Sequence, residues 1–492
     1  MSFNTYKYIF LFIPITLIGY FYLTSKNKEI YKLKLSKLWL ILASFVFYGL
    51  GNIKNLFLLL AIAIFNFYIC KTILKNLRET NIKKRQLAFI FGVFLNVFLL
   101  VFFKYTNFFI AIINHFTNDT IKPVNIIMPI GISFFTFTQI ACLVYIYKNE
   151  ELEFDFNFLD FLLFVVFFPY LLSGPIVYCT EIIPQLQKNE NKVINSKHIA
   201  IGIYLFSIGL FKKVFISDYL AQWADNGFSA NELTFIEAWL TSLSYTFQLY
   251  FDFSGYTDMA IGSALFFNIK LPLNFNSPYK SINIQEFWRR WHITLGRFLR
   301  DHIYIPLGGN RLSKSRTMIN VLITFLICGL WHGAGWTFIV WGLLHGFGMV
   351  IFRLWKTFNI NIPKALAWFI TFNFINIAWV FFRATDFKEA IKVLKGMFGM
   401  NGIVLPMAFI NKLGFLENYN IKFGGFLANI QGNLMTVIFV LSILFVSLWF
   451  RNSNEMAKTF KPNILNIIFI GCIFALAFLR LSSTSEFLYF KF

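Results

Sequence analysis

Residues 318–346 read MINVLITFLICGLWHGAGWTFIVWGLLHG, a run that contains no Asp, Glu, Lys or Arg. A helix needs about 20 predominantly apolar residues to cross the hydrocarbon core of a bilayer. The run is long enough for one span, which is expected to begin near Met318, and for the start of a second near Trp336. It therefore predicts that lipid is the solvent of this part of the chain.

The remaining sequence has the same apolar character. Of its 492 residues, 58% are hydrophobic and 14% are charged, whereas about a quarter of the residues of a soluble protein are charged. Further apolar runs begin near Tyr8, Leu38, Leu56, Leu87, Ile126, Phe158, Ile199, Phe235, Thr257, Ala365, Leu434 and Leu465. Because some are short or broken by Gly and Pro, we expect about 11 transmembrane helices, the others being re-entrant or interfacial. The predicted fold class is an all-α polytopic membrane protein, folded as a single domain over residues 1–492.

The charged residues predict how the chain is oriented in the membrane. Lys and Arg total 44 against 23 Asp and Glu, a formal net charge of +21. The excess falls in short loops between apolar runs, which the positive-inside rule explains without a nucleic-acid partner. The basic loops at residues 26–37, 71–85 and 270–316 are expected to face the cytoplasm. The apolar run at residues 8–23 lacks the flanks of a signal peptide, so it is expected to be a retained helix that starts outside.

Cysteines and histidines indicate neither a disulfide framework nor a metal site. The five cysteines are scattered and form no C-x-x-C pair, and no two of the six histidines share metal-ligand spacing on one helix face. We therefore expect no metal cofactor.

The basic segment EFWRRWHITLGRFLR, residues 286–300, predicts an amphipathic interfacial helix. At 100° per residue its aromatic and leucine side chains share one arc, and His292 falls on the border. The opposite arc carries Arg289, Arg290, Arg297 and Arg300. Two interpretations stay open: Arg289 and Arg290 bind the phosphates of an acyl-carrying cofactor, or the helix is an anchor on anionic lipid headgroups. Periodicity alone favours the anchor.

His332 is the candidate for chemistry inside the membrane. It is expected roughly 20 Å from the cytoplasmic end of a helix that starts near Met318. A histidine at that depth usually faces the protein interior or a water-filled cavity. Gly329, Gly333 and Gly335 leave room for another backbone or a substrate. A neutral imidazole there could accept a proton from a hydroxyl. The residues alone leave open whether His332 is a general base or a hydrogen-bonded structural residue.

Other polar residues in apolar runs have weaker interpretations. His345 is expected to be a satisfied core histidine. Asp252 and Asp258 lie six positions apart, too far round a helix for an acid–base pair, and with Gln248 they could line a passage, pair with the arginines or fix the packing. Residues 167–176, FFPYLLSGPI, predict an unwound helix that lines a cavity.

Several segments together resemble the bacterial branch of the membrane-bound O-acyltransferase family. They are residues 129–140, 167–176, 204–218, 249–311, 328–346 and 379–398. The resemblance implies a ring of helices around a central tunnel, with a family core at about 126–400. It implies that the W-H-G histidine, His332, is catalytic. It also implies that the R-W-H histidine, His292, is the second functional position and acts on the donor at the cytoplasmic mouth.

The same resemblance predicts the reaction. It implies transfer of an acyl group, with acetyl favoured, from a cytoplasmic thioester donor such as acetyl-CoA. The acceptor would be a cell-wall or exported polysaccharide such as peptidoglycan or alginate. A periplasmic acetyltransferase would be the partner, and the bacterial inner membrane the location. The wording of PLNFNSPY and WHGAGWTF favours acetylation over D-alanyl transfer to teichoic acid. That transfer, and transport of a polysaccharide precursor without catalysis, remain alternatives.

Overall fold

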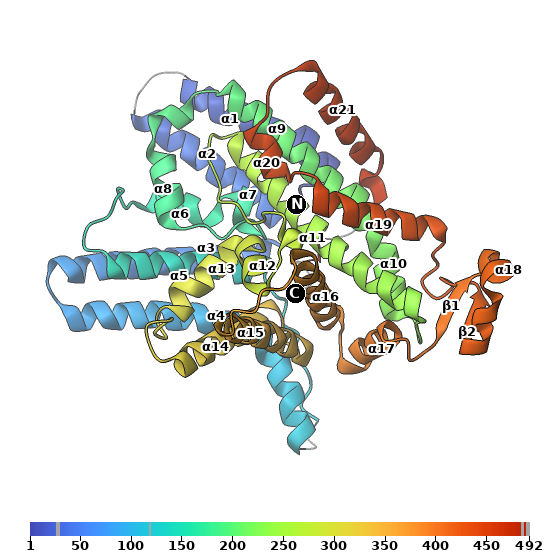
Figure 1. The fold of residues 1–492 in the computed structure, drawn as a ribbon. Coiled ribbons are helices and arrows are strands. Elements are labelled where there is room, and N and C mark those ends of the chain that lie inside the picture. The colour runs from blue at the N-terminus through green and yellow to red at the C-terminus, as the bar shows by residue number, and fades with distance from the viewer. Residues whose placement is uncertain (26–29, 118–119, 484–486, 489–492) are drawn as a thin grey trace. The chain divides into compact units, whose positions relative to one another are not determined.

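Helices account for most of the protein. The computed structural model describes residues 1–25, 30–117, 120–483 and 487–488 (Figure 1). The one sheet within these residues pairs two short parallel strands, β1 (Ile403–Pro406) and β2 (Ile421–Gly424). The prediction of an all-α fold class is confirmed.

The helices include many of membrane-spanning character. Among the described residues, six helices are long and apolar enough to cross a bilayer: α3 (Ile53–Arg78), α4 (Ile82–Thr117), the continuous run Ser196–Ser229, α14 (Lys314–His332), α15 (Trp336–Thr357) and α16 (Lys364–Arg383). Four shorter apolar helices are Tyr8–Thr24, α5 (Ile132–Lys148), α19 (Leu434–Trp449) and α21 (Ile464–Leu479). The chain is therefore a polytopic membrane protein, as predicted. The two spans expected near Phe235 and Thr257 form a single helix, α11 (Phe235–Leu265).

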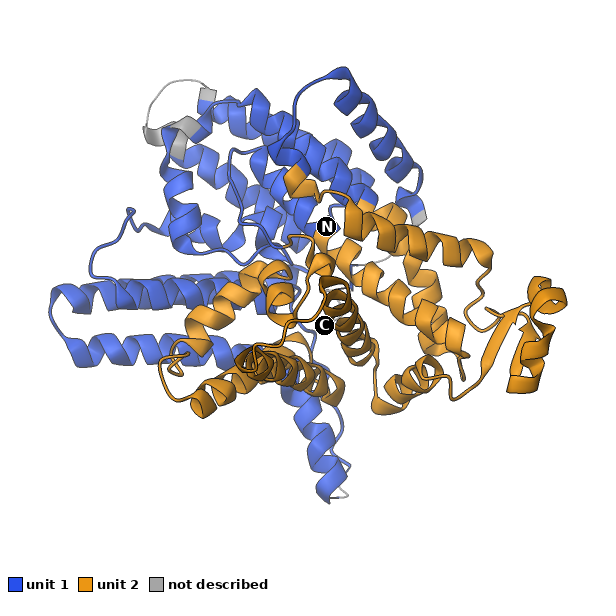
Figure 2. Cartoon of the chain, in the orientation of Figure 1, with its two compact units in different colours: residues 1–211, 255–274, 456–491 blue, residues 212–254, 275–455, 492 orange. Residues whose placement is uncertain are grey.

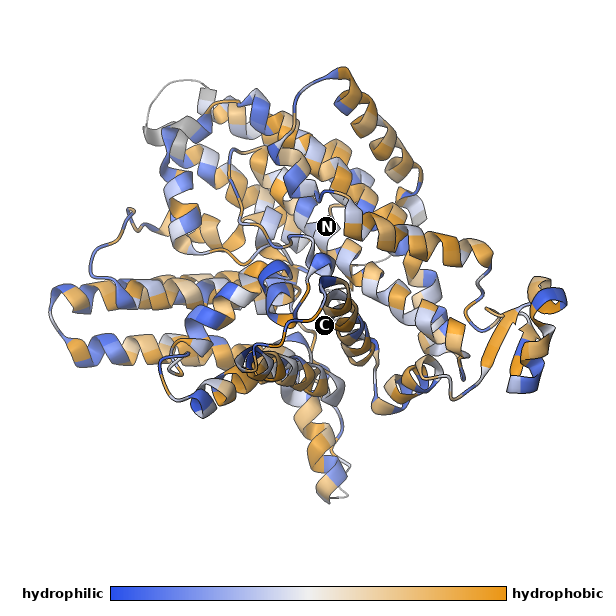
Figure 3. Ribbon diagram, viewed as in Figure 1, coloured by the Kyte–Doolittle hydropathy of each residue, from blue (hydrophilic) through white to orange (hydrophobic). Residues whose placement is uncertain are grey.

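The exposed faces of these helices are suited to lipid. On α4, Phe94, Phe98, Phe102 and Phe109 are all exposed. Figure 3 shows α19 and α21 as almost uniformly hydrophobic. Contiguous exposed apolar surface of this extent is rare on soluble proteins and normal in a bilayer.

The chain forms two compact units (Figure 2). Unit 1 comprises residues 1–211, 255–274 and 456–491. Within it α1 (Ile13–Ser25) packs on α2 (Ile30–Gly49), α3 packs on α4 and α5, and α21 packs on α9 (Ser196–Phe211). Unit 2 comprises residues 212–254 and 275–455. The expectation of a single domain over residues 1–492 stays a prediction.

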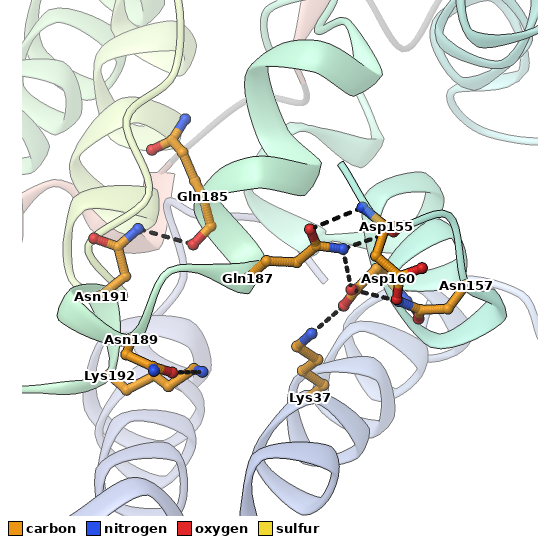
Figure 4. A network of polar contacts seen from close by, with 9 residues as sticks. All are labelled: Lys37, Asp155, Asn157, Asp160, Gln185, Gln187, Asn189, Asn191 and Lys192. Atoms are coloured by element: carbon orange, nitrogen blue, oxygen red, sulfur yellow. Dashed lines mark hydrogen bonds and ion pairs between the residues drawn. The ribbon is translucent and has the colours of Figure 1, made fainter. Parts of the chain in front are cut away.

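A polar network in unit 1 surrounds Asp160, which is buried in α6 (Phe158–Val166). Its carboxylate pairs with Lys37 of α2 and accepts hydrogen bonds from Asn157 and Gln187, each at 2.8 Å (Figure 4). An unpaired buried carboxylate would be strongly destabilising. Lys37, which the sequence placed among the lysines of a cytoplasmic loop, therefore neutralises a buried acid from within a helix.

The run at residues 167–176 is irregular and buried. Helix α6 ends at Val166, α7 (Phe168–Leu171) is a single turn, and irregular backbone continues to α8 (Cys179–Gln187). Irregular backbone in an apolar interior needs partners for its polar groups, and the Phe168 N–H donates to Ser44 Oγ at 3.2 Å. The predicted unwinding is confirmed, whereas the cavity remains a prediction.

Unit 2 positions the candidate site. Helices α14 and α15 form a hairpin, α16 packs on α15, and α17 (Phe387–Met397) packs on α16. The short helix α12 (Ile284–Arg290) also packs on α15. Three fully buried indoles mark the core of this unit: Trp291, Trp341 and Trp379.

Candidate active site

His332 is the last residue of α14. Gly333 is extended and ends the helix, and α15 begins three residues later at Trp336. The helix starts at Lys314, earlier than expected, so at 1.5 Å per residue His332 lies about 27 Å along it. The histidine therefore lies at the turn of the α14–α15 hairpin, farther from the basic end of the helix than the sequence predicted.

The glycines near His332 allow close packing of the hairpin. A Cβ on Gly329 would lie 2.4 Å from the Phe338 carbonyl oxygen and 3.2 Å from the Gly342 Cα. A Cβ on Gly333 would lie 2.1 Å from the Phe338 ring. The sequence predicted that these glycines leave room for another backbone or for a substrate. In the structure the backbone of α15 lies close to Gly329, and the ring of Phe338 lies close to Gly333.

Aromatic rings surround the His332 imidazole, which is 3% exposed. The centroid distances are 4.8 Å to Trp331, 5.0 Å to Trp341 and 5.1 Å to Phe382. The side chain is therefore held in a buried aromatic setting built from α14, α15 and α16.

His292 lies at a break in the backbone, which corrects the prediction of one helix over residues 286–300. Helix α12 ends at Arg290, α13 (Ile293–Leu299) follows, and His292 between them has φ 42° and ψ 54°. The Arg290 carbonyl accepts the Asn276 N–H at 2.9 Å, a bond from outside the helix at the point where α12 ends. His tolerates this left-handed region better than most residues.

His292 is fully buried, and the same indole contacts both predicted histidines. Its ring centroid lies 4.8 Å from Phe253 and 5.9 Å from Trp331, and Trp331 in turn lies 4.8 Å from His332. Burial lowers the pKa of His292 to about 3, so its imidazole is neutral at physiological pH. The structure thus brings together the two histidines that the sequence separated by 40 positions.

The two candidate arginines differ in their contacts. Arg290 donates two hydrogen bonds to Glu286 Oε1, at 3.1 and 2.9 Å, and a third to the Asn276 carbonyl at 3.1 Å. Arg289 is exposed and makes no hydrogen bond or ion pair with the described part of the chain. Arg290 therefore fixes the corner before His292, and Arg289 is the one available to an anion.

His345 is a third histidine of the site. It is fully buried, accepts a hydrogen bond from Trp288 Nε1 at 3.2 Å and lies 4.9 Å from Trp341. The expectation of a satisfied core histidine is only half correct, because Nε2 has no partner in the described residues. Those residues also contain no group of three or more His, Cys, Asp or Glu able to hold a metal ion.

Sequence reasoning missed a buried ion triad. Lys213 Nζ lies 2.7 Å from Asp252 and 2.8 Å from Asp218, and all three side chains are at most 9% exposed. Lys213 belongs to a short π-helix (Lys212–Ser217). Asp252 thus pairs with a lysine. The sequence feature that could have predicted the triad is the pair of lysines inside an apolar run, because a charged side chain within the membrane needs a partner.

Comparisons with known proteins fit this arrangement. Residues 148–385 match the model of the membrane-bound O-acyltransferase family. The chain is 45% identical to a peptidoglycan O-acetyltransferase of Helicobacter pylori over 522 residues, covering 100% of this chain and 98% of the relative. A probable alginate O-acetylase of Pseudomonas aeruginosa is 39% identical over 81% of this chain and 75% of its own. A teichoic acid D-alanyltransferase of Streptococcus thermophilus is 30% identical over an alignment that covers 51% of this chain and 68% of the relative.

Proposed function

Because the chain belongs to the membrane-bound O-acyltransferase family, we propose that this acyltransferase moves an acetyl group from a cytoplasmic thioester donor, such as acetyl-CoA, to a polysaccharide hydroxyl. Peptidoglycan is the favoured acceptor, since the relative named for that polymer aligns over the whole chain and the probable alginate O-acetylase over 81% of it. D-alanyl transfer is less favoured, because that relative aligns over 51% of the chain. We further propose a bacterial cytoplasmic membrane location and a periplasmic acetyltransferase partner.

One observation carries the assignment of the reactive centre: Trp331 contacts both His292 and His332. In the proposed reaction His332 removes the proton from the attacking hydroxyl as a general base. Its place at the C-terminus of α14 supports this role, because a helix C-terminus stabilises positive charge that develops on the imidazole. The proton then passes to the departing thiolate.

His292 and Arg289 would act on the donor. A neutral buried imidazole can orient the thioester by a hydrogen bond without bringing a fixed charge into an apolar site. Arg289, exposed three positions before His292, is the proposed contact for donor phosphates. Arg290, the second residue predicted to bind phosphate, is proposed instead to hold the backbone corner, because its donors are engaged by Glu286 and Asn276.

The test replaces His332 in a bacterium that lacks its own membrane O-acetyltransferase. Cells producing the His332→Ala variant should release at least 100-fold less base-labile acetate from peptidoglycan than cells with the unchanged protein, as expected for loss of a general base. Immunoblots of membranes confirm insertion, and His115→Ala, which alters an exposed histidine of α4, is the matched control. Wild-type acetate with His332→Ala would defeat the assignment. Base-released D-alanine in place of acetate would favour the alternative acyl group.

A further inference from the structure

A hydrogen bond from Trp288 fixes the tautomer of His345. The imidazole is 0% exposed, and its Nδ1 lies 3.2 Å from the indole nitrogen of Trp288. An indole N–H can only donate, so Nδ1 is the acceptor and carries no proton. The single proton of a neutral imidazole must then be on Nε2. His345 therefore presents a buried Nε2–H donor.

A second donor lies beside it. Trp341 precedes His345 by one helical turn on the same face of α15, is 0% exposed, and has its ring centroid 4.9 Å from the imidazole. In the described residues neither Trp341 Nε1 nor His345 Nε2 has a hydrogen-bond partner. Buried polar groups are almost always paired, since an unpaired donor is destabilising. Two unpaired donors on neighbouring rings are consistent with a ligand that supplies an acceptor.

The surroundings specify what kind of acceptor fits. The Trp341 ring lies 5.0 Å from His332, the proposed base, so the donors adjoin the reacting centre. Trp379 stacks on Trp341 at 5.6 Å, and Phe382 lies 5.0 Å from it, so the walls are aromatic. The buried Nε1 of Trp379 also has no hydrogen-bond partner in the described residues. The N–H donors of Trp341 and His345 within aromatic walls suit a small group with one oxygen, and hydrogen bonds to an oxyanion are strong where water is excluded.

We propose that His345 and Trp341 form a donor pair that binds the carbonyl oxygen of the transferred acyl group and stabilises the negative charge that develops on it. This inference rests on the acyl transfer proposed above. It assigns a catalytic role to a histidine that the sequence analysis placed in the core. Trp288 is a positioning residue, because its hydrogen bond keeps the proton of His345 on Nε2.

The reaction step balances with these groups. The acceptor oxygen bonds to the thioester carbon while His332 takes the hydroxyl proton, and the carbonyl electron pair moves onto the oxygen held by Trp341 and His345. The tetrahedral intermediate then restores the carbonyl and breaks the carbon–sulfur bond. The proton on His332 passes to sulfur, so the products are an ester and a free thiol.

The test removes each N–H donor while keeping an aromatic ring at the position. Trp341→Phe and His345→Phe lack the N–H, and His345→Gln keeps a donor. Initial rates of labelled acetyl transfer from acetyl-CoA are measured in membrane vesicles that contain the acceptor polymer, at varied acetyl-CoA concentration. Loss of one oxyanion donor should lower kcat on the order of 100-fold with little change in KM for acetyl-CoA. His345→Gln should recover part of the rate. If Trp341→Phe does not accumulate, the two His345 variants decide the question.

The matched control is Trp368→Phe in α16. Its indole donates to the Tyr279 carbonyl at 2.9 Å, so its loss should lower the melting temperature and leave kcat intact. Trp341→Phe should lower kcat, and it should also lower the melting temperature because it removes buried volume, so kcat is the readout that separates the two variants. Wild-type kcat in Trp341→Phe and His345→Phe would overturn the donor pair while leaving the acyltransferase proposal standing. Absence of acetyl transfer by the unchanged protein would overturn both.

Discussion

Replacing Lys213 with Met should destabilise the protein more than any single change at its acidic partners. The lysine is 0% exposed and lies 2.7 Å from Asp252 and 2.8 Å from Asp218. Removing it takes away a cation that contacts two buried carboxylates. Breaking a buried ion pair from one side costs about 3–5 kcal/mol, because the remaining charge stays desolvated.

Protonation sets an independent bound on that cost. A buried carboxylate that has lost its cation can lose its charge by binding a proton. This costs about 1.4 kcal/mol for each pH unit between the reference pKa of about 3.9 and the pH of the solution, or about 4 kcal/mol at pH 7. The two estimates agree. The penalty should also shrink as the pH falls, by about 3 kcal/mol between pH 7 and pH 5 for one carboxylate.

The assay is thermal unfolding of the detergent-solubilised protein, followed by tryptophan fluorescence at pH 7 and pH 5. Lys213→Met should melt well below wild type at pH 7 and closer to it at pH 5. Asp252→Asn, which leaves Lys213 paired one-to-one with Asp218, should be mild, and adding it to Lys213→Met should recover about half of the loss. Equal melting of Lys213→Met and wild type at both pH values would refute the reasoning.

Three further predictions concern the site. Burial lowers the pKa of His292 to about 3 in the folded state, below its reference of about 6.5. The contribution of His292 to the free energy of unfolding is therefore fully present above pH 6.5. It decreases as the pH is lowered and is about 2 kcal/mol smaller at pH 5. His292→Asn, which tolerates the same left-handed backbone, should remove that part of the acid sensitivity in melting experiments. Arg289→Ala should raise KM for acetyl-CoA with little effect on melting, whereas Arg290→Ala should lower the melting temperature; the reverse pattern would contradict their assignments. Gly329→Ala should disrupt the hairpin, because its Cβ would meet a backbone oxygen at 2.4 Å, while Gly335→Ala, with nothing nearer than 3.6 Å, should keep normal membrane levels on immunoblots.

The sequence predicted features that depend on composition and local pattern. Uncharged runs such as residues 318–346 predicted the fold class, because the length and apolar composition of a segment are enough to identify a membrane span without knowing which other helices it packs against. His332 and His292 were chosen from their motifs and contact the same indole in the structure. Their catalytic and donor-binding roles stay predictions.

Features that depend on distant partners were not predictable in the same way. The helical periodicity of the sequence predicted one helix that continues through His292. The hydrogen bond that the Asn276 N–H donates to the Arg290 carbonyl comes from another segment, so periodicity could not reveal it. Arg290 looked equivalent to Arg289 until its ties to Glu286 and Asn276 were known. In both cases Asn276 supplies a contact from outside the local helical repeat, whereas the Arg290–Glu286 pair is an i,i+4 contact that the sequence could have predicted.

The depth of His292 changes how the donor must approach. Trp331 lies about 26 Å along α14 from Lys314, and His292 contacts its ring, so His292 lies near the end of α14 opposite Lys314. Arg289 precedes His292 by three residues and is therefore within about 11 Å of it. Its guanidinium is exposed, and because a charge in the apolar core of the bilayer would be costly, it is expected to lie in water or among polar headgroups. The backbone of a residue in polar surroundings is therefore within about 11 Å of the His292 backbone, which brings polar surroundings closer to the site than the burial of His332 alone would suggest.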